Sequence, residues 1–255
     1  MNSAIQRNKA SLGATALPLL VLLCLTLAAQ LGSLAYTVDG SFLSALGPSV
    51  LVLCAVTIPL ATLGLVLGQN VGFGAPLLTD LLDRKRGSGK QLLLDAKLAI
   101  VLGLSLGALL VLIRLVHRPF LPPEMPELGH RGALGGFLVS VGAAVGEEVW
   151  LRLGVLTIVA RVLMYLYRRT DVDAIVGWSA VVFSAIAFAV IHLPQLAYYE
   201  AATPVGIAAT VAGNTLVGLL YGWLYWRRSL IAAMVGHFAV DIVLHVLPAF
   251  GSFAV

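Results

Sequence analysis

The stretch VGAAVGEEVWLRLGV, residues 141–155, places two glutamates and an arginine inside a long apolar segment. That segment runs from Gly132 to Val159, and about 20 mostly apolar residues are enough to cross a bilayer. Lipid offers no partners to backbone N–H and C=O groups, so a spanning segment must be helical. Charged side chains are costly in such a helix and usually mark function. The stretch therefore predicts a transmembrane helix that carries part of a functional site.

The composition of the whole chain is that of a membrane protein. Of its 255 residues, 60% are hydrophobic and only 11% are charged, whereas a soluble domain carries about 25% charged residues. So few charges cannot cover a soluble globule, and lipid must be the main solvent. The net charge of +4 is modest and no basic run alternates with aromatic residues, so nucleic acid is not an expected partner. Cys24 and Cys54 lack metal-ligand spacing and are interpreted as small buried residues.

Apolar stretches of sufficient length recur along the chain, without an evident internal repeat. The predicted spans are residues 17–36, 46–68, 96–116, 132–159, 176–193, 204–226 and 230–247. The expected fold class is all-α, a multi-pass helical transmembrane bundle of about seven spans. Within this single membrane domain, residues 1–131 supply N-terminal helices and loops, and residues 132–255 form the core that holds most of the intramembrane charges.

Positive charge is divided unevenly between the two ends of these spans. One end has only Arg114, Arg118 and Arg131, and Arg152 lies inside a span. The other end has the remaining Lys and Arg residues, which are Arg7, Lys9, Arg84, Lys85, Arg86, Lys90, Lys97, Arg161, Arg168, Arg169, Arg227 and Arg228. Since Lys and Arg are enriched at cytoplasmic ends, we expect a cell-membrane protein with its N-terminus in the cytoplasm and its C-terminus outside.

Two loops between the spans have distinct compositions. The segment PLLTDLLDRKR, residues 76–86, predicts either a short helix on the membrane surface or a solvated linker. Residues 119–126 hold four prolines and predict an ordered turn without regular structure.

Ionisable residues also occur in the fifth and seventh predicted spans. The fifth contains FSAIAFAVIHLPQ with His192, and the seventh contains LIAAMVGHFAVDIVLH with His237 and Asp241. Residues four apart share a helix face, so His237 can pair with Asp241, which could fix the imidazole tautomer or share a ligand with it. We predict that the fifth span extends through Pro194 to Tyr199, with a kink that brings His192 deeper.

The two glutamates of the fourth span face different directions. Glu148 and Arg152 are four residues apart and can form an ion pair. Glu147 points about 100° away from Glu148 and has no partner on its own helix. If the three helices pack together, one cavity receives Glu147, His192, His237 and Asp241. Such a set can activate water and stabilise an oxyanion, with or without a metal. His117, His130 and His245 lie near span ends or in a loop and are expected at the membrane interface.

These motifs resemble those of the CPBP family, the intramembrane proteases that comprise prenyl-protein CAAX endopeptidases, bacterial Abi proteins and bacteriocin-processing relatives. The family motif EExxxR is matched by Glu147, Glu148 and Arg152, FxxxH by Phe188 and His192, and HxxxN/D by His237 and Asp241. The three motifs occur in the family's order, each in a separate apolar span. The resemblance covers the chain from Gly132 onward.

The resemblance implies an intramembrane endopeptidase. Glu147 would activate the attacking water beside His192, Phe188 would wall the substrate pocket, and Glu148 and Arg152 would be architectural. His237 and Asp241 would stabilise the oxyanion, or would hold a divalent metal such as zinc together with Glu147 and His192. No HExxH pair is present, so a zincin-type site is not supported. Asp241 stands where the eukaryotic CAAX enzymes have asparagine, which favours the bacterial branch and weakens the case for a prenylated substrate.

The expected partners are a peptide or lipidated-peptide substrate and the lipid bilayer, and the sequence specifies no oligomeric state. Two other functions use the same residues. One is a proton- or cation-coupled transporter, in which the acids and histidines form a relay. The other is a catalytically silent immunity or scaffold protein of the membrane.

Overall fold

The computed structural model describes residues 12–38, 40–69 and 71–251, and the regular structure in this part of the chain is entirely helical. Seven helical segments are long and apolar enough to cross a membrane: residues 15–37, 42–68, 88–120, 132–166, 174–198, 204–227 and 230–250. They match the seven predicted spans one for one. The chain is therefore a multi-pass membrane protein with the all-α architecture expected from its sequence.

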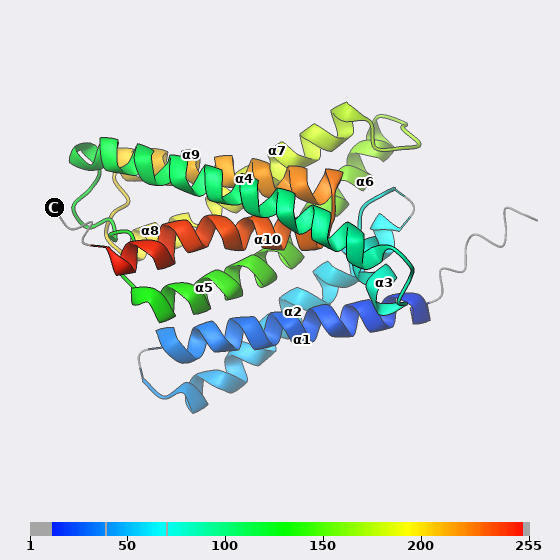
Figure 1. Ribbon diagram of the computed structural model, residues 1–255, viewed down its shortest axis with the longest axis horizontal. Helices are drawn as coiled ribbons and strands as arrows, with labels where there is room; N and C mark the ends of the chain where they lie inside the picture. Colours follow the sequence, from blue (N-terminus) through cyan, green and yellow to red (C-terminus); the bar gives the residue numbers. More distant parts are fainter. Residues whose placement is uncertain (1–11, 39, 70, 252–255) are drawn as a thin grey trace, which may run out of the picture.

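The N-terminal spans flank the bundle. In chain order the elements are α1 (Leu12–Thr37), α2 (Phe42–Gly68), α3 (Pro76–Leu82), α4 (Ser88–His117) and the short 3₁₀ helix η2 (Arg118–Phe120). Helices α1 and α2 lie together on one side, and α4 runs along α10 on another (Figure 1). The predicted short helix in residues 76–86 is present as α3. The proline-rich loop, predicted to lack regular structure, instead begins with the 3₁₀ turn of η2.

The C-terminal spans form the centre of the bundle. Their elements are α5 (Gly132–Glu147), η3 (Glu148–Leu156), α6 (Thr157–Leu166), α7 (Ala174–Val190), α8 (Leu193–Tyr198), α9 (Pro204–Arg227), α10 (Leu230–Asp241), η4 (Ile242–Val246) and η5 (Leu247–Phe250). α7 packs along α9, and α10 packs against both α4 and α9. The fully buried apolar side chains of this region, such as Leu153, Val181 and Leu224, make up much of the core.

Two of the central helices change their winding at residues that the sequence singled out. The segments η3 and η4 are π-helical, and they begin directly after Glu147 and Asp241. A π-helix bonds residue i to i+5 and often occurs at functional sites. It rotates the following side chains away from the positions that an α-helix of 3.6 residues per turn would give them.

The fifth span is interrupted at His192. Helix α7 ends at Val190, the chain turns through Ile191 and His192, and α8 continues from Leu193 with Pro194 in its first turn. The predicted extension of this span is confirmed, because the membrane-crossing segment reaches Tyr198. A turn between two helices takes the place of the predicted kink within one helix.

Close helix contacts depend on glycine. A Cβ added at Gly64 in α2 would overlap the backbone of Leu153, and one added at Gly103 in α4 would overlap the backbone of Gly236. Small residues that let backbones approach are the usual means of packing helices in lipid. These two glycines join the flanking helices to the central ones.

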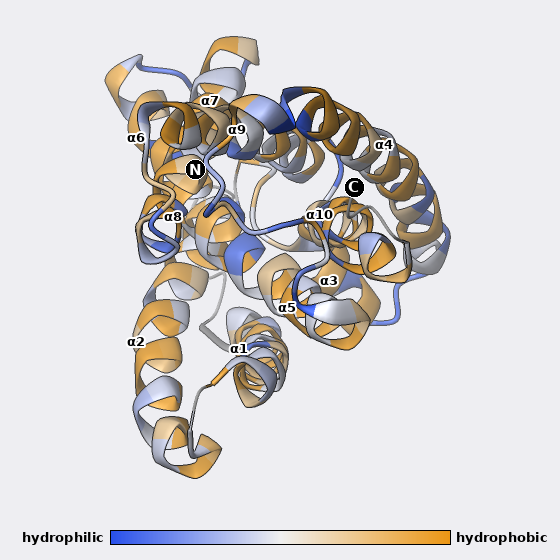
Figure 2. Cartoon of the chain, turned by 90° about the vertical axis from the view of Figure 1, so that its left-hand side faces the viewer, coloured by the Kyte–Doolittle hydropathy of each residue, from blue (hydrophilic) through white to orange (hydrophobic). Residues whose placement is uncertain are grey.

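The outward surface is apolar, as a lipid-facing surface should be. Figure 2 shows hydrophobic residues along much of α2 and α4. The prediction that both cysteines are buried was wrong, because Cys54 is only partly buried and Cys24 is exposed. Its helix lies at the edge of the bundle and turns that side chain toward the lipid. The third span also begins earlier than predicted and takes in Asp95, which is buried.

Candidate active site

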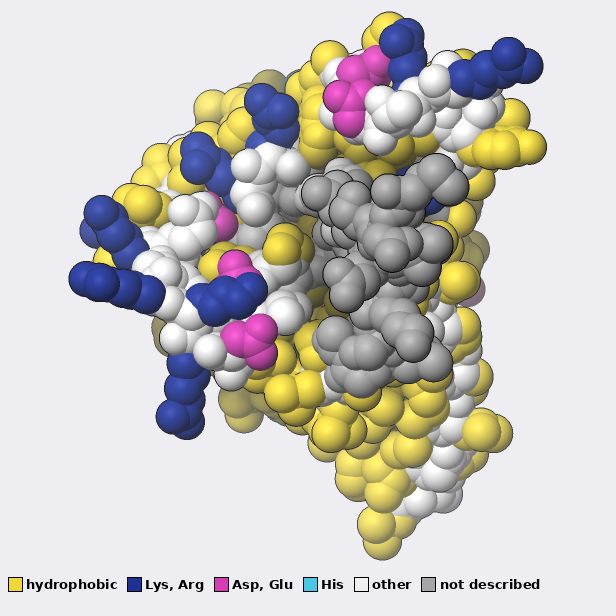
Figure 3. Space-filling view, turned by 90° about the vertical axis from the view of Figure 1, so that its right-hand side faces the viewer, with side chains coloured by type: hydrophobic (Ala, Val, Ile, Leu, Met, Phe, Trp, Pro, Cys, Tyr) yellow, Lys and Arg dark blue, Asp and Glu magenta, His cyan; other side chains and the backbone are white. Residues whose placement is uncertain are grey.

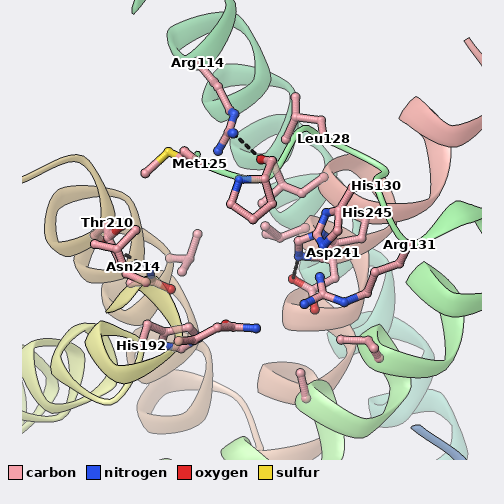
Figure 4. Close-up of a pocket in the computed structure, with 18 of the residues that line it drawn as sticks. Arg114, Met125, Leu128, His130, Arg131, His192, Thr210, Asn214, Asp241 and His245 are labelled. Atoms are coloured by element: carbon pink, nitrogen blue, oxygen red, sulfur yellow. Dashed lines mark hydrogen bonds and ion pairs between the residues drawn. The ribbon is translucent and has the colours of Figure 1, made fainter. Parts of the chain in front are cut away.

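One cavity of about 360 Å³ lies among α5, α7, α9 and α10. Its wall includes Glu147, Phe188, His192, His237 and Asp241, so the three motifs contribute to a single space. Loop residues preceding α5 and side chains from α8 and α9 surround its outer part (Figure 4). Glu148 and Arg152 of the first motif are fully buried behind the wall and do not line the cavity.

Glu148 and Arg152 form a buried ion pair. Arg152 Nε lies 3.3 Å from Glu148 Oε2, and both side chains have no exposed surface. The guanidinium donates to Ser184 Oγ at 3.2 Å and stands 5.0 Å from the centre of the Phe188 ring. A buried charge is tolerable when it is paired with an opposite charge, and this pair meets that condition. Its hydrogen bonding is incomplete, because Glu148 Oε2, Arg152 Nε and Arg152 Nη2 have no hydrogen-bond partner among the described residues.

Glu148 also holds His237. Its Oε1 accepts a hydrogen bond from His237 Nδ1 at 2.9 Å. The other ring nitrogen, Nε2, faces the cavity, 3.6 Å from Asp241 Oδ2 and 4.0 Å from Glu147 Oε2. We predicted that Asp241 could fix the tautomer of His237, but it is Glu148 that contacts Nδ1 in the structure. The reason is that η3 and α10 lie side by side, a tertiary contact that helical spacing does not contain.

Glu147 differs from the adjacent Glu148 in its exposure to the cavity. Its side chain is 20% exposed, compared with 0% for Glu148. Among the described residues, its buried Oε2 atom has no hydrogen-bond partner. A carboxylate oxygen in this position is free to accept a proton from a group that enters the cavity.

His192 sits at the turn between α7 and α8. Its Nδ1 donates to the backbone carbonyl of Phe188 at 2.7 Å, which leaves Nε2 as the nitrogen available to a bound group. The Phe188 ring lies between the two histidines, with centroid distances of 4.8 Å to His192 and 5.7 Å to His237. Phe188 thus spaces the two imidazoles and fills the wall between them.

The outer part of the cavity carries positive charge. Arg114 donates to the Pro126 carbonyl, and Arg131 donates to the Tyr199 hydroxyl at 3.1 Å. Burial lowers the pKa of His130, and the nearby Arg131 lowers it further, so this imidazole is neutral at pH 7. Arg114 and Arg131 therefore supply the positive charge at the rim, beside the carboxylate of Glu127, which also lines the cavity and pairs with Arg118.

A comparison with protein families decides the assignment. Residues 129–243 match the family described as type II CAAX prenyl endopeptidase, Rce1-like. This part of the chain belongs to the CAAX-protease family. The match confirms the resemblance carried by the three motifs, all of which lie within it. Comparisons with curated proteins and with solved structures gave no match.

The CAAX-protease segment contains site residues that the sequence analysis missed. Tyr221 of α9 stacks on His237, with ring centroids 4.3 Å apart and planes 14° apart. Asn214, two turns earlier on α9, also lines the cavity. The sixth span carries no charge and so attracted no attention, but a tyrosine and an asparagine seven residues apart on one helix face were a usable signal.

Two histidines assigned to the membrane interface also reach the cavity. His245 Nε2 lies 4.0 Å from Asp241 Oδ1, and His130 belongs to the rim. The π-helical winding of η4 contributes to the position of His245, and the loop before α5 folds back over the site to bring in His130. His117 lies outside the cavity wall and hydrogen-bonds to the backbone of its own helix, as an interfacial residue can.

The donor atoms of the CAAX-protease segment do not form a ready metal site. In the described part of the chain, no group of three or more His, Cys, Asp or Glu side chains is arranged to hold a metal ion. Glu147, His192, His237 and Asp241, the four candidate ligands, share a cavity but are not so arranged.

Proposed function

We propose that this chain is an intramembrane endopeptidase in which Glu147 activates a water molecule for attack on a peptide bond. The observation that carries the proposal is the contrast between the two adjacent glutamates. Glu148 is enclosed and paired with Arg152 and His237. Oε2 of each glutamate accepts no hydrogen bond from the described residues. That of Glu148 faces Arg152 Nε at 3.3 Å, whereas Glu147 lines the cavity and, in the described part of the chain, has no arginine or lysine paired with it. A general base needs such an unoccupied acceptor beside the reacting atoms.

The proposed reaction is hydrolysis through a tetrahedral intermediate. A water molecule between Glu147 and the substrate gives a proton to the carboxylate while its oxygen bonds to the peptide carbonyl carbon. Glu147 then passes that proton to the peptide nitrogen as the C–N bond breaks. The products are a new carboxylate and a new amine. His192 Nε2 faces the same cavity and helps to orient the water.

The group proposed to stabilise the developing oxyanion is His237, whose Nε2 lies 4.0 Å from Glu147 Oε2. His237, when protonated at Nε2, donates to the oxyanion, while Nδ1 stays bound to Glu148. Asp241 lies 3.6 Å from the same Nε2 and orients the ring from the other side. Donors fixed before the reaction stabilise developing charge without the cost of reorganisation. Glu148 and Arg152 are positioning residues here, since they act through His237.

The substrate class is a membrane-associated peptide, with or without a lipid. A second cavity of about 460 Å³ lies between α4 and α9 and is lined mainly by apolar side chains. It shares Asn214, Val217 and Leu244 with the site cavity. A hydrophobic side chain or a lipid attached to the substrate would lie there while the peptide bond reaches Glu147. Both prenylated and unprenylated peptides therefore belong in the test.

The test is cleavage of a peptide panel by the purified protein in nanodiscs, followed by mass spectrometry. Glu147→Gln removes the base at nearly constant volume and should lower cleavage by about 10²–10⁴-fold. The matched control is Asp95→Asn, since Asp95 is also a buried carboxylate but lies outside the cavity. The control should cleave at the wild-type rate.

Other results would contradict the proposal. Equal cleavage by wild type and Glu147→Gln would remove Glu147 from the role of base. Absence of cleavage together with proton flux in liposomes that Glu147→Gln abolishes would favour a transporter. A cellular phenotype that survives replacement of both Glu147 and His192 would favour a silent scaffold.

A further inference from the structure

The two ends of the bundle differ in charge. Ten of the described Lys and Arg residues lie at the end formed by α3, the start of α4 and the ends of α6 and α9. They are Arg84, Lys85, Arg86, Lys90, Lys97, Arg161, Arg168, Arg169, Arg227 and Arg228. Figure 3 looks onto this end and shows the Lys and Arg side chains spread across it. We call it the basic end.

The site cavity belongs to the other end. Its outer wall is built from residues 125–131, from α8 and from the first half of α9. In Figure 1, α8 and the last described residues lie at the left, opposite α3 and α6 at the right. No residue of the basic end lines the cavity. We call this second end the rim end.

The cavity extends a long way from the rim end. Glu147 lies fifteen residues after Gly132, or about 22 Å along a helix at 1.5 Å per residue. Arg131, Val139, Ala143 and Glu147 all line the cavity, so the hollow follows much of α5. A group that starts at the rim can therefore reach Glu147 without crossing the hydrocarbon.

The path from the basic end is closed by packed side chains. Each central helix places buried residues between its site residue and the basic end. They form one apolar cluster that includes Leu153 and Leu156 of η3, Val176, Ala180 and Val181 of α7, Leu224 and Tyr225 of α9, and Leu230, Ala232 and Ala233 of α10. All of them are at most 3% exposed. Protein interiors of this density do not admit a peptide.

These observations combine with a general rule of membrane topology. The cytoplasmic ends of transmembrane helices carry the excess of Lys and Arg. We infer that the basic end is cytoplasmic, that the cavity opens on the extracytoplasmic side, and that the substrates are peptide segments exposed on that side of the membrane. The assignment of substrates rests on the proposed peptidase function. A tail that remains in the cytoplasm would meet the closed end.

The sidedness can be tested without any enzyme activity. In a background that carries Cys24→Ser and Cys54→Ser, single cysteines are placed at two exposed turns, Ala202→Cys at the rim end and Thr170→Cys at the basic end. Neither change alters the charge of a loop. Intact bacterial cells that express each variant are treated with a membrane-impermeant maleimide. The Ala202 variant should label as fully as after permeabilisation, and the Thr170 variant should label only after permeabilisation. The reverse pattern would overturn the inference.

A third variant tests access to the cavity itself. Asn214→Cys places a thiol in the cavity wall, and a small impermeant methanethiosulfonate reagent should modify it from outside intact cells. Modification only from the cytoplasmic face, as measured in inside-out vesicles, would contradict the inference even if the turns label as expected.

Cleavage in oriented vesicles tests the substrate class. Right-side-out vesicles should cleave an impermeant peptide without detergent, and inside-out vesicles only after solubilisation. Cleavage by intact inside-out vesicles alone would overturn the inference. If the solubilised protein cleaves nothing, the peptidase proposal fails, while the labelling pattern still decides which side the cavity faces.

Discussion

The first three spans and the last four are built in different ways. In the most apolar window of each span, 17–22% of residues are buried in the first three, compared with 28–50% in the last four. The early helices therefore present most of their surface to lipid, whereas the later helices enclose one another. Charged side chains inside the membrane are therefore expected among the enclosed helices. Only the enclosed group offers enough partners to hold an arginine, three carboxylates and two imidazoles within a few helical turns.

One carboxylate of the first three spans, Asp95, is also enclosed and hydrogen-bonded. Asp95 of α4 is 1% exposed, and its oxygens accept hydrogen bonds from Gln91 at 2.7 Å and from Ser229 at 3.0 Å. The second bond ties α4 to the start of α10. Asp95 is thus satisfied and structural, whereas Glu147 keeps an unsatisfied oxygen inside a cavity. Partnering, rather than burial, separates the structural carboxylate from the proposed catalytic one.

The largest stability effect should come from breaking the buried pair of the central spans. Arg152→Met leaves Glu148 charged and without its cation, and such losses cost about 3–5 kcal/mol. The matched control is Arg169→Gln, which breaks the exposed pair with Asp173 and should cost less than about 1 kcal/mol. Denaturant titration in mixed micelles measures both. Equal losses would show that the central network is no more important to folding than a surface pair.

A smaller loss of stability is expected where the first three spans contact the last four. Gly64→Ala puts a Cβ against the Leu153 backbone, and overpacking of this kind costs about 1–3 kcal/mol. Gly47→Ala in the same helix meets no atom within 4 Å and controls for helix propensity. Thermal unfolding in detergent should separate the two variants, and an unchanged midpoint for Gly64→Ala would contradict the close contact between α2 and η3.

A functional effect without a large loss of stability is expected at Tyr221. Tyr221→Phe keeps the ring that stacks on His237 and should cleave the substrate almost normally. Tyr221→Leu removes the stack, which is worth about 0.5–1.5 kcal/mol, and should lower kcat by about two- to tenfold. Steady-state cleavage assays measure both variants. A Leu variant as active as Phe would show that the stack does not position His237.

The smallest effect is expected on the lipid-facing side of the first group. Leu51 in α2 is 72% exposed, so Leu51→Ala removes surface that already faces lipid. Its unfolding free energy and its cleavage rate should both stay near wild type, within about 0.5 kcal/mol. A clear loss of stability would show that this face of α2 is covered by another chain.

The sequence predicted the spans well because lipid imposes a simple rule of length and apolarity. It also predicted that Glu147, His192, His237 and Asp241 belong together, and the structure places all four in one cavity. These predictions succeed because unpaired charges in lipid are rare and so carry much information.

The sequence did not predict which side chains of different helices contact one another. The hydrogen bond from His237 to Glu148 and the stack on Tyr221 depend on which helices touch, which no spacing within one helix reveals. The π-helical segments after Glu147 and Asp241 could not be anticipated either, because the expected angles assumed α-helical winding. Asp95 was missed because the third helix starts eight residues before the predicted span.

The role of Glu147 as the general base is tested most directly by the kinetics of Glu147→Gln on a peptide that the wild-type protein cleaves. With Asp95→Asn as the control, kcat and KM are measured for all three proteins, and folding is checked by thermal unfolding. We expect Glu147→Gln to lower kcat by about 10²–10⁴-fold with little change in KM, and the control to match wild type. A folded Glu147→Gln variant with wild-type kcat would contradict the role of Glu147 as the general base.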